Sequence, residues 1–304
     1  MKILITGVAG FIGNSLAKYL ETDERYVVSG LDKRLNRFNV CDILEYSNLE
    51  KTFASESPEI VIHLAARTDL GGTSLEDYSE NILGTSNVLR VSKMFGVSKV
   101  IVASSMLVNP FVNSRQSNLQ PTVYGLSKLK MEELIHDEYQ DMDISVVRIT
   151  SAWGPGFDHP YKDFFQRIHQ KRYFNIASQR TIKTFIFIDN LNIIFEKLIT
   201  VSGKKTFYAC DDHIEISSWA NRINSFYRKG NCLELPYFLA KSLALFGDVI
   251  VKIGFSFPMT SYRLNNLTED NIIDLNTSLE IIGFDRINLE EATKKTIKYL
   301  NKNA

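Results

Sequence analysis

Tyr124 and Lys128 are the residues best suited to chemistry, and they lie four positions apart. On a helix this spacing puts both side chains on one face, so a phenol and an ammonium can meet one ligand. Lowering a tyrosine pKa from about 10 to ~7 requires roughly 4 kcal/mol. A unit charge at ~4 Å supplies about that much at an effective dielectric of ~20. The pair alone identifies no site, because Tyr and Lys often share solvated helix faces.

A glycine-rich turn must position a ligand for this pair. An apolar run at residues 2–6 precedes it, and a helical pattern follows it. The turn contains Gly7, Gly10, Phe11, Ile12 and Gly13. Its glycines allow a pyrophosphate to approach backbone N–H groups at a helix start, where the macrodipole favours an anion. The turn therefore predicts dinucleotide binding, although its spacing is G-x-x-G-x-x-G.

Asp32 ends the second apolar run, nineteen residues after Gly13. A carboxylate at this place accepts hydrogen bonds from an adenosine ribose and repels a 2′-phosphate. Lys33 and Arg34 follow it and could attract such a phosphate. We expect NAD as the cofactor, with NADP as the alternative.

Apolar runs alternate with helical patterns up to Arg148, which indicates an α/β fold with a doubly wound parallel sheet. The expected strands include residues 39–41, 60–66, 100–105, 144–148 and 184–188. Ligands of such sheets bind beyond the carboxyl ends of the strands, where Gly7, Asp32, Ala65 and Ser105 fall. We expect a dinucleotide-binding domain at 1–150 and about 184–202. A smaller mixed lobe takes about 151–183 and 203–304.

Composition narrows the class of protein. The 304 residues contain 35 Lys plus Arg and 35 Asp plus Glu, so no net charge points to nucleic acid or an anionic membrane. The three cysteines are widely spaced and form no disulfide framework or zinc site, so no metal is predicted. The start of the chain lacks the pattern of a secretion signal. A cytoplasmic protein is expected.

The segment from Leu235 to Phe257 is the most apolar part of the chain. Lys241, Asp248 and Lys252 interrupt it, so it lacks the uncharged run that a membrane span requires. Its apolar residues recur at steps of three and four, which favours a buried or interface helix over a membrane role.

The motifs taken together resemble the extended short-chain dehydrogenase/reductases, and among them the NAD-dependent epimerase/dehydratase family acting on nucleotide sugars. The resemblance spans nearly the whole chain. It rests on the three glycines, Asp32, Asp42, His63-Leu-Ala-Ala66, Asn81, Gly84-Thr85, Ser104-Ser105, Tyr124-x-x-x-Lys128, Arg148 and Trp153-Gly-Pro-Gly156. It implies a Rossmann domain, a C-terminal substrate lobe and a homodimer through helices near 76–94 and 125–139.

The resemblance also implies roles for individual residues. Tyr124 is the expected acid/base, Lys128 holds the nicotinamide ribose, and Ser105 hydrogen-bonds the reacting sugar oxygen. Further cofactor contacts are expected from Lys33, Asp42, Ile43, Leu64, Ala65, Ala66 and Asn81. Substrate contacts are expected from Thr68, Met106, Ser151 and Lys183, in addition to Ser105 and Tyr124. His63 stands in a buried strand and is interpreted as a packed histidine, not a base.

Departures from the family pattern narrow the reaction. Family dehydratases place an Asp-Glu pair after the catalytic hydroxyl, whereas this chain has Met106 and Leu107, which cannot transfer protons. Ser151 stands where Asn is common, and Lys183 stands where Arg is common, so a bidentate phosphate contact becomes a single ammonium. The sequence favours a nucleotide-sugar 4-epimerase. An NAD(P)H-dependent 4-keto-sugar reductase and a non-catalytic nucleotide sensor are the alternatives.

Overall fold

The apolar runs of the first half form one large parallel sheet. The computed structural model describes residues 1–35, 37–112, 119–158, 160–203, 205–283 and 286–303. Within them, seven strands pair in the order β10-β6-β5-β4-β1-β2-β3. They are β1 (Lys2–Thr6), β2 (Val27–Asp32), β3 (Asn39–Val40), β4 (Ile60–His63), β5 (Lys99–Ser105), β6 (Ile144–Ile149) and β10 (Lys205–Ala209). Helices bury both faces, which explains why most of these strands read as continuous apolar runs.

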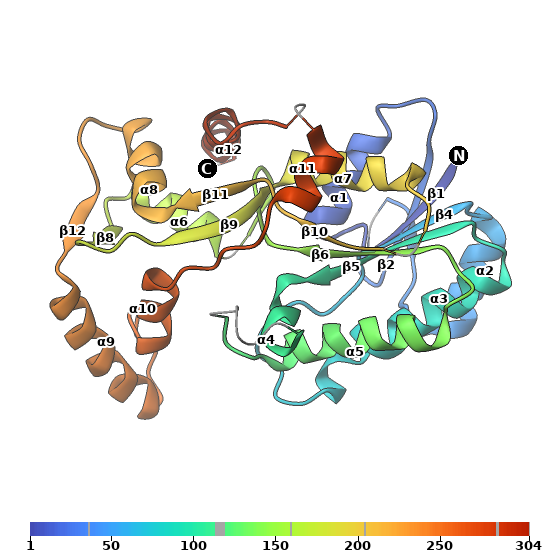
Figure 1. The fold of residues 1–304 in the computed structure, drawn as a ribbon, viewed down its shortest axis with the longest axis horizontal. Coiled ribbons are helices and arrows are strands. Elements are labelled where there is room, and N and C mark those ends of the chain that lie inside the picture. The colour runs from blue at the N-terminus through green and yellow to red at the C-terminus, as the bar shows by residue number, and fades with distance from the viewer. Residues whose placement is uncertain (36, 113–118, 159, 204, 284–285, 304) are drawn as a thin grey trace.

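Helices cover the sheet on two sides (Figure 1). One side holds α2 (Tyr46–Glu56), α3 (Thr85–Met94) and α5 (Val123–Glu138), whose apolar faces share a core with the sheet. The other side holds α1 (Phe11–Leu20) and α7 (Ile188–Thr200). The strand order reverses between β1 and β4, so a ligand crevice is expected at the carboxyl ends of these two strands. The doubly wound α/β fold predicted from the sequence is confirmed.

Two smaller sheets form the remaining lobe, seen at the left of Figure 1. One has the order β11-β9-β7 and the other pairs β12 with β8. Their strands are β7 (Ser151–Trp153), β8 (Phe174–Ile176), β9 (Ile182–Phe187), β11 (Asp212–Glu215) and β12 (Leu233–Leu235). Trp153 and Trp219 meet edge to face, with ring centroids 4.8 Å apart, in the aromatic core below this sheet. The sequence grouped residues 184–202 with the large domain; α7 in this range packs on the large sheet, whereas β9 pairs with β7 and β11, and β10 joins the large sheet.

The other helices of the second half are α6 (Tyr161–His169), α8 (Ile216–Ser225), α9 (Tyr237–Lys252), α10 (Ser261–Thr268), α11 (Asn276–Ile282) and α12 (Leu289–Lys302). Helix α9 covers most of the apolar segment noted in the sequence. The sequence predicted a buried or interface helix for this segment. The buried alternative is wrong for the single chain, because Phe238 is 67% exposed and Phe246 is 56% exposed. Within the described ranges, no helix combines the length and apolar character needed to cross a bilayer.

Candidate active site

The start of α5 brings the predicted catalytic tyrosine to the end of β5. Thr122 caps the helix, since its Oγ1 accepts a hydrogen bond from the Gly125 N–H at 2.9 Å. Gly125 has no room for a side chain, because a Cβ there would lie 2.2 Å from the Leu107 carbonyl oxygen. The residue after Tyr124 must therefore be glycine for α5 to pack on the turn η3 (Met106–Val108) that follows Ser105.

Ser105 and Tyr124 meet directly. The Ser105 side chain lies close enough to the Tyr124 hydroxyl to lower its pKa, and the Ser105 Oγ accepts a hydrogen bond from the Leu107 N–H at 3.2 Å. Both residues are buried, and the ring of Tyr78 lies 6.0 Å from that of Tyr124. Burial raises the pKa of Tyr124 to about 12, although the Ser105 side chain opposes the rise. The structure thus joins the two hydroxyls that the sequence singled out.

Lys128 lies in the same buried region, but its ammonium has other partners. Nζ donates to the Ala103 carbonyl oxygen at 2.9 Å, and burial lowers the pKa of Lys128 to about 8. The sequence predicted that this cation lowers the pKa of Tyr124. In the chain alone the pKa of Tyr124 is raised instead, because burial dominates and the ammonium is hydrogen-bonded to β5.

Asn81, in the π-helical turn η2 (Glu80–Gly84), joins two parts of the site. Its Oδ1 accepts from the Arg67 N–H at 2.9 Å, and its Nδ2 donates to the Arg67 carbonyl oxygen and to the Ser127 Oγ. Ser127 donates in turn to the Tyr124 carbonyl oxygen at 2.7 Å. Asn81 was predicted to contact cofactor, but its fully buried amide holds these protein groups.

His63 is buried in a chain of hydrogen bonds whose direction can be assigned. Thr6 Oγ1 accepts from the Leu64 and Ala65 N–H groups, so its own proton goes to His63 Nδ1 at 2.7 Å. His63 Nε2 then carries the other proton and donates to Thr85 Oγ1 at 2.9 Å. Burial lowers the pKa of His63 to about 3, with Lys128 adding to the effect. The contacts agree with the interpretation of His63 as a satisfied, neutral histidine.

The glycine turn fits a dinucleotide by its shape. A Cβ on Gly7 would lie 2.7 Å from the Ala65 nitrogen, and one on Gly13 would lie 2.3 Å from the Gly7 oxygen. Gly10 caps α1 without a side chain, and no side-chain oxygen of the described residues bonds the first turn there. Phe11 and Ile12 belong to that first turn. Backbone donors at a helix start are a suitable site for a pyrophosphate.

Asp32 lies beside this turn with its carboxylate already engaged. Oδ2 accepts from the Ala9 N–H at 3.1 Å, and the Arg34 guanidinium contacts both carboxylate oxygens, with Nε 3.0 Å from Oδ1. Burial would raise the pKa of Asp32, but the hydrogen bonds from Arg34 and Ala9 hold it below its usual range. Lys33 points elsewhere and pairs with Glu80 at 2.8 Å. Arg34 is therefore the cation at the predicted ribose position.

The remaining predicted cofactor residues line the neighbouring loops. Asp42 follows β3 and its Oδ1 accepts from the Leu44 N–H at 3.0 Å. Ile43 is buried against Gly84, where a Cβ would come within 2.5 Å of its Cδ1. The loop after β4 contains Leu64, Ala65 and Ala66, and all three are partly exposed.

The two lobes meet next to Ser105. Met106 Sδ accepts a hydrogen bond from Asn271 Nδ2 at 3.3 Å, and Asn271 pairs through the backbone with Lys183 of β9. Burial lowers the pKa of Lys183. These contacts bring Met106 and Lys183, two predicted substrate residues, to one region. Asn271 was missed, since an Asn-Ile-Ile stretch carries no motif.

The other two predicted substrate residues have separate surroundings. Ser151 lies on β7, where its side chain is close enough to the partly buried Tyr161 to affect the pKa of that phenol. Thr68 is exposed on the loop after β4.

A partly buried ion pair joins β6 to α5, the helix of the proposed catalytic residues, and was not predicted. Arg148 on β6 binds Glu132 on α5, with Nε and Nη2 contacting the carboxylate at 3.0 and 2.6 Å. Glu132 also accepts from the Ser104 hydroxyl at 2.5 Å, and Arg148 donates to the Tyr208 hydroxyl. The only sequence signal was the spacing of Glu132, one helical turn after Lys128.

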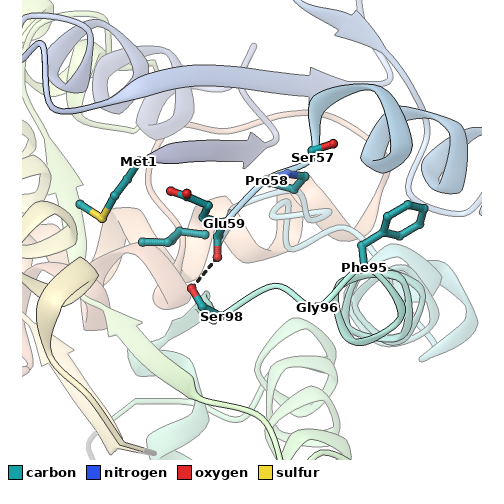
Figure 2. A pocket seen from close by; sticks show the side chains of 8 residues that line it. Met1, Ser57, Pro58, Glu59, Phe95, Gly96 and Ser98 are labelled. Atoms are coloured by element: carbon teal, nitrogen blue, oxygen red, sulfur yellow. Dashed lines mark hydrogen bonds between the residues drawn. The ribbon is translucent and has the colours of Figure 1, made fainter.

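A hollow at the opposite edge of the sheet is unrelated to these residues. It is lined by Met1, Glu59, Phe95 and Ser98 among others, at the amino-terminal ends of the strands (Figure 2). The dashed line in Figure 2 marks the hydrogen bond that the Ser98 hydroxyl donates to the Glu59 carbonyl. Among the described residues, no cluster of three or more His, Cys, Asp or Glu could hold a metal ion.

Comparison with known proteins places this geometry in a family. UDP-glucuronate 4-epimerase of Thermodesulfobacterium geofontis is 31% identical over 256 residues, covering 70% of this chain and 78% of that protein. Protein CapI of Staphylococcus aureus is 30% identical over 185 residues, and the match spans about half of each protein, 51% and 55%. A Bacillus cereus UDP-glucuronic acid 4-epimerase, solved with UDP-glucuronic acid and NAD, superposes over 100% of both chains, with a TM-score of 0.73 and 19% identity.

The profile of the NAD dependent epimerase/dehydratase family matches residues 3–201, a span that contains the glycine turn, Asp32, Ser105, Tyr124 and Lys128. The matched part covers well over half of the chain. The chain therefore belongs to the NAD-dependent epimerase/dehydratase family of extended short-chain dehydrogenase/reductases, whose cofactor is NAD or NADP.

Proposed function

We propose that this protein is a nucleotide-sugar 4-epimerase that uses a retained NAD. The observation that carries the proposal is the placement of the buried Ser105 and Tyr124 side chains beside each other at the carboxyl end of β5, on the same sheet edge as the glycine turn. When bound, the cofactor supplies a hydride acceptor and donor and a positive ring that makes the tyrosine phenolate less costly. The substrate class is a sugar linked to a nucleoside diphosphate.

The residues of the chain handle the proton. Tyr124 takes the proton of the C4 hydroxyl as the alcohol becomes a ketone, and it returns that proton when the ketone is reduced on its other face. The Ser105 hydroxyl donates to the same sugar oxygen and stabilises the charge that develops on it. Lys128, fixed by the Ala103 carbonyl, orients the ribose beside this pair. No net oxidation results.

Dehydration does not fit these residues. Elimination of water needs a second acid and base next to the sugar ring. Met106 has a thioether, which accepts a hydrogen bond from Asn271. Leu107 has an alkyl side chain, and only its backbone N–H makes a hydrogen bond, to the Ser105 Oγ. Neither side chain exchanges protons, so the chemistry is confined to one carbon.

A 4-keto-sugar reductase is the second candidate, and Arg34 is the observation that favours it. Its guanidinium sits on Asp32, where a 2′-phosphate would bring negative charge. Such an enzyme consumes NADPH or NADH and releases the oxidised cofactor. A non-catalytic nucleotide sensor is the third hypothesis. A sensor would not require the Ser105 and Tyr124 pair, so this hypothesis leaves the pair unexplained.

The deciding experiment combines product analysis with absorbance. The purified protein is incubated with a panel of nucleotide-diphosphate sugars and their 4-keto forms, with and without NADPH. An epimerase converts a sugar to its C4 epimer without added cofactor and leaves the absorbance at about 340 nm unchanged. Stoichiometric loss of that absorbance with a 4-keto sugar identifies the reductase, and no turnover of any substrate identifies the sensor. The homodimer through residues 76–94 and 125–139 stays a prediction.

A further inference from the structure

Helix α9 presents an apolar face that nothing in the described structure covers. Four of its apolar side chains are more than half exposed, and the loop that follows adds two more. We call this set the α9 face; it consists of Phe238, Leu245, Phe246, Val249, Ile253 and Phe255. In Figure 1, α9 lies at the lower left end of the molecule, next to α10 and away from the large sheet. Contiguous apolar patches of this kind mark interaction sites, because monomeric proteins rarely expose them.

Helix α9 buries its small residues and exposes most of its large apolar ones, whereas an ordinary amphipathic helix buries its large apolar residues. Its buried positions are the small residues Ala240, Ala244 and Gly247. Gly247 is required there, because a Cβ would lie 1.9 Å from the Met259 carbonyl oxygen. The small residues let α9 lie flat on the segment before α10, and they leave most of the large apolar side chains of α9 exposed. Burial in this chain therefore does not account for the large residues.

The charged side chains along α9 and the segment after it are mainly cationic. Between residues 235 and 263 the cations are Lys241, Lys252 and Arg263, and the only carboxylate is Asp248. Asp248 is occupied on the inner side, where it accepts from the Ser261 N–H at 3.0 Å and from the Ser261 hydroxyl at 2.5 Å. Neither Lys241 nor Lys252 has an ion-pair partner among the described residues, and both are exposed. An apolar stripe beside free lysines matches a helix that lies in a lipid interface.

These charges select one occupant. A second copy of the chain would bring the same cations to the contact and no free carboxylate from its own α9, so like charges would meet at the rim. A bilayer with anionic headgroups supplies apolar depth for the phenylalanines and negative charge for the lysines. We propose that the α9 face binds the surface of an anionic phospholipid bilayer, with α9 lying in the plane of the interface and not crossing it.

This binding would orient the active site. The unit of α9 and α10 continues into Asn271, which contacts Met106 next to Ser105 and pairs with Lys183. Asn271 is the third residue after the end of α10 at Thr268, so the substrate side of the proposed site is close in sequence to the helix pair that presents the α9 face. The inference goes beyond the proposed reaction and does not depend on it.

The test is flotation with vesicles of phosphatidylglycerol and phosphatidylcholine in equal parts, compared with phosphatidylcholine alone. We expect the full chain to float with the anionic vesicles and to be released by salt. The double variant Phe238→Ser/Phe246→Ser should bind at least about tenfold less, because it removes two aromatic groups from the interface. Lys241→Glu/Lys252→Glu should lose the preference for anionic lipid. The matched control is Val27→Ser, which changes a side chain 62% exposed on the large domain.

Three results would overturn the proposal. If the full chain does not float with anionic vesicles, it has no lipid-binding face. The phenylalanine variant could float as well as the parent, in which case another surface binds lipid. Sedimentation could show self-association that only the phenylalanine variant abolishes, which assigns the α9 face to a second copy. Circular dichroism checks that each variant is folded, and no step requires a sugar substrate, so failure here leaves the proposed reaction untouched.

Discussion

The Asn81 amide donates to the Ser127 hydroxyl at 2.9 Å, and through Ser127 it holds the backbone of the catalytic helix at Tyr124. All three residues are buried. The contact ties the helix that carries the proposed acid/base to the loop after β4, which is expected to line the cofactor site. A polar bridge of this kind fixes the distance between the two only while every partner is present.

Ser127→Ala should therefore destabilise the protein and disturb the site together. It leaves one of the two N–H groups of the Asn81 amide without an acceptor, while the other still donates to the Arg67 carbonyl, and an unsatisfied buried donor costs about 1–3 kcal/mol. Urea unfolding followed by circular dichroism measures the loss. Ser242→Ala is the matched control, because the exposed Ser242 hydroxyl donates only to the carbonyl of its own helix. An equal and small effect of both changes would contradict the bridging role.

Tyr124→Phe should lower turnover by about 10²–10⁴-fold, the usual contribution of a general acid/base. Cofactor affinity should change little, because only a hydroxyl is removed. Tyr78→Phe is the control, since the neighbouring Tyr78 hydroxyl donates to the Asp69 carbonyl and not to the reacting group. Initial rates on the preferred sugar measure both. Unchanged turnover in Tyr124→Phe would exclude the assigned role.

His63 makes the stability of the protein depend on pH in a defined window. Its pKa falls from 6.5 to about 3 on folding, so the unfolded chain binds a proton that the native protein refuses. This contribution to stability is fully present above pH ~6.5 and is lost as the pH falls towards ~3. His63→Gln should flatten that acid limb relative to the parent protein, while the exposed His136→Gln should not. Unfolding free energies at several pH values test the difference.

Much of the site could be predicted because its signals are local. The glycine turn, Asp32 and the Tyr124 to Lys128 spacing each lie within one element, and the parallel sheet brings them to one edge. The partners of these residues could not be predicted. Whether Lys128 contacts Tyr124 or the Ala103 carbonyl depends on how α5 packs on β5, and Asn271 reaches Met106 across a separation of 165 residues.

For the α9 segment, too, the sequence predicted the helix but not its packing. Its sequence indicated a helix correctly, with apolar residues at helical spacing. Which face is buried depended on Ala240, Ala244 and Gly247, whose small size matters only against Met259. Hydrophobic periodicity counts large apolar residues as core, so it could not reveal that they lie outside.

Arg34→Ala should change the preference between the two cofactors. Asp32 disfavours a 2′-phosphate, and Arg34 is the neighbouring cation that can offset this repulsion. Removing the guanidinium should weaken NADP binding by about tenfold or more relative to NAD, because one charged contact is worth roughly 1.5–3 kcal/mol. NAD binding should hold or improve, since the Asp32 carboxylate becomes free to accept from ribose hydroxyls. Titration of both cofactors by calorimetry gives the ratio of the two Kd values.

Lys33→Ala is the matched control for that measurement, because the Lys33 ammonium is engaged by Glu80 and not by Asp32. It removes the same formal charge one residue away, so a general loss of positive potential would affect both variants alike. A change in the cofactor ratio confined to Arg34→Ala assigns the discrimination to the guanidinium on Asp32. Equal changes in the two variants would instead make the preference a property of the local field, and the pairing of Arg34 with Asp32 would have no part in it.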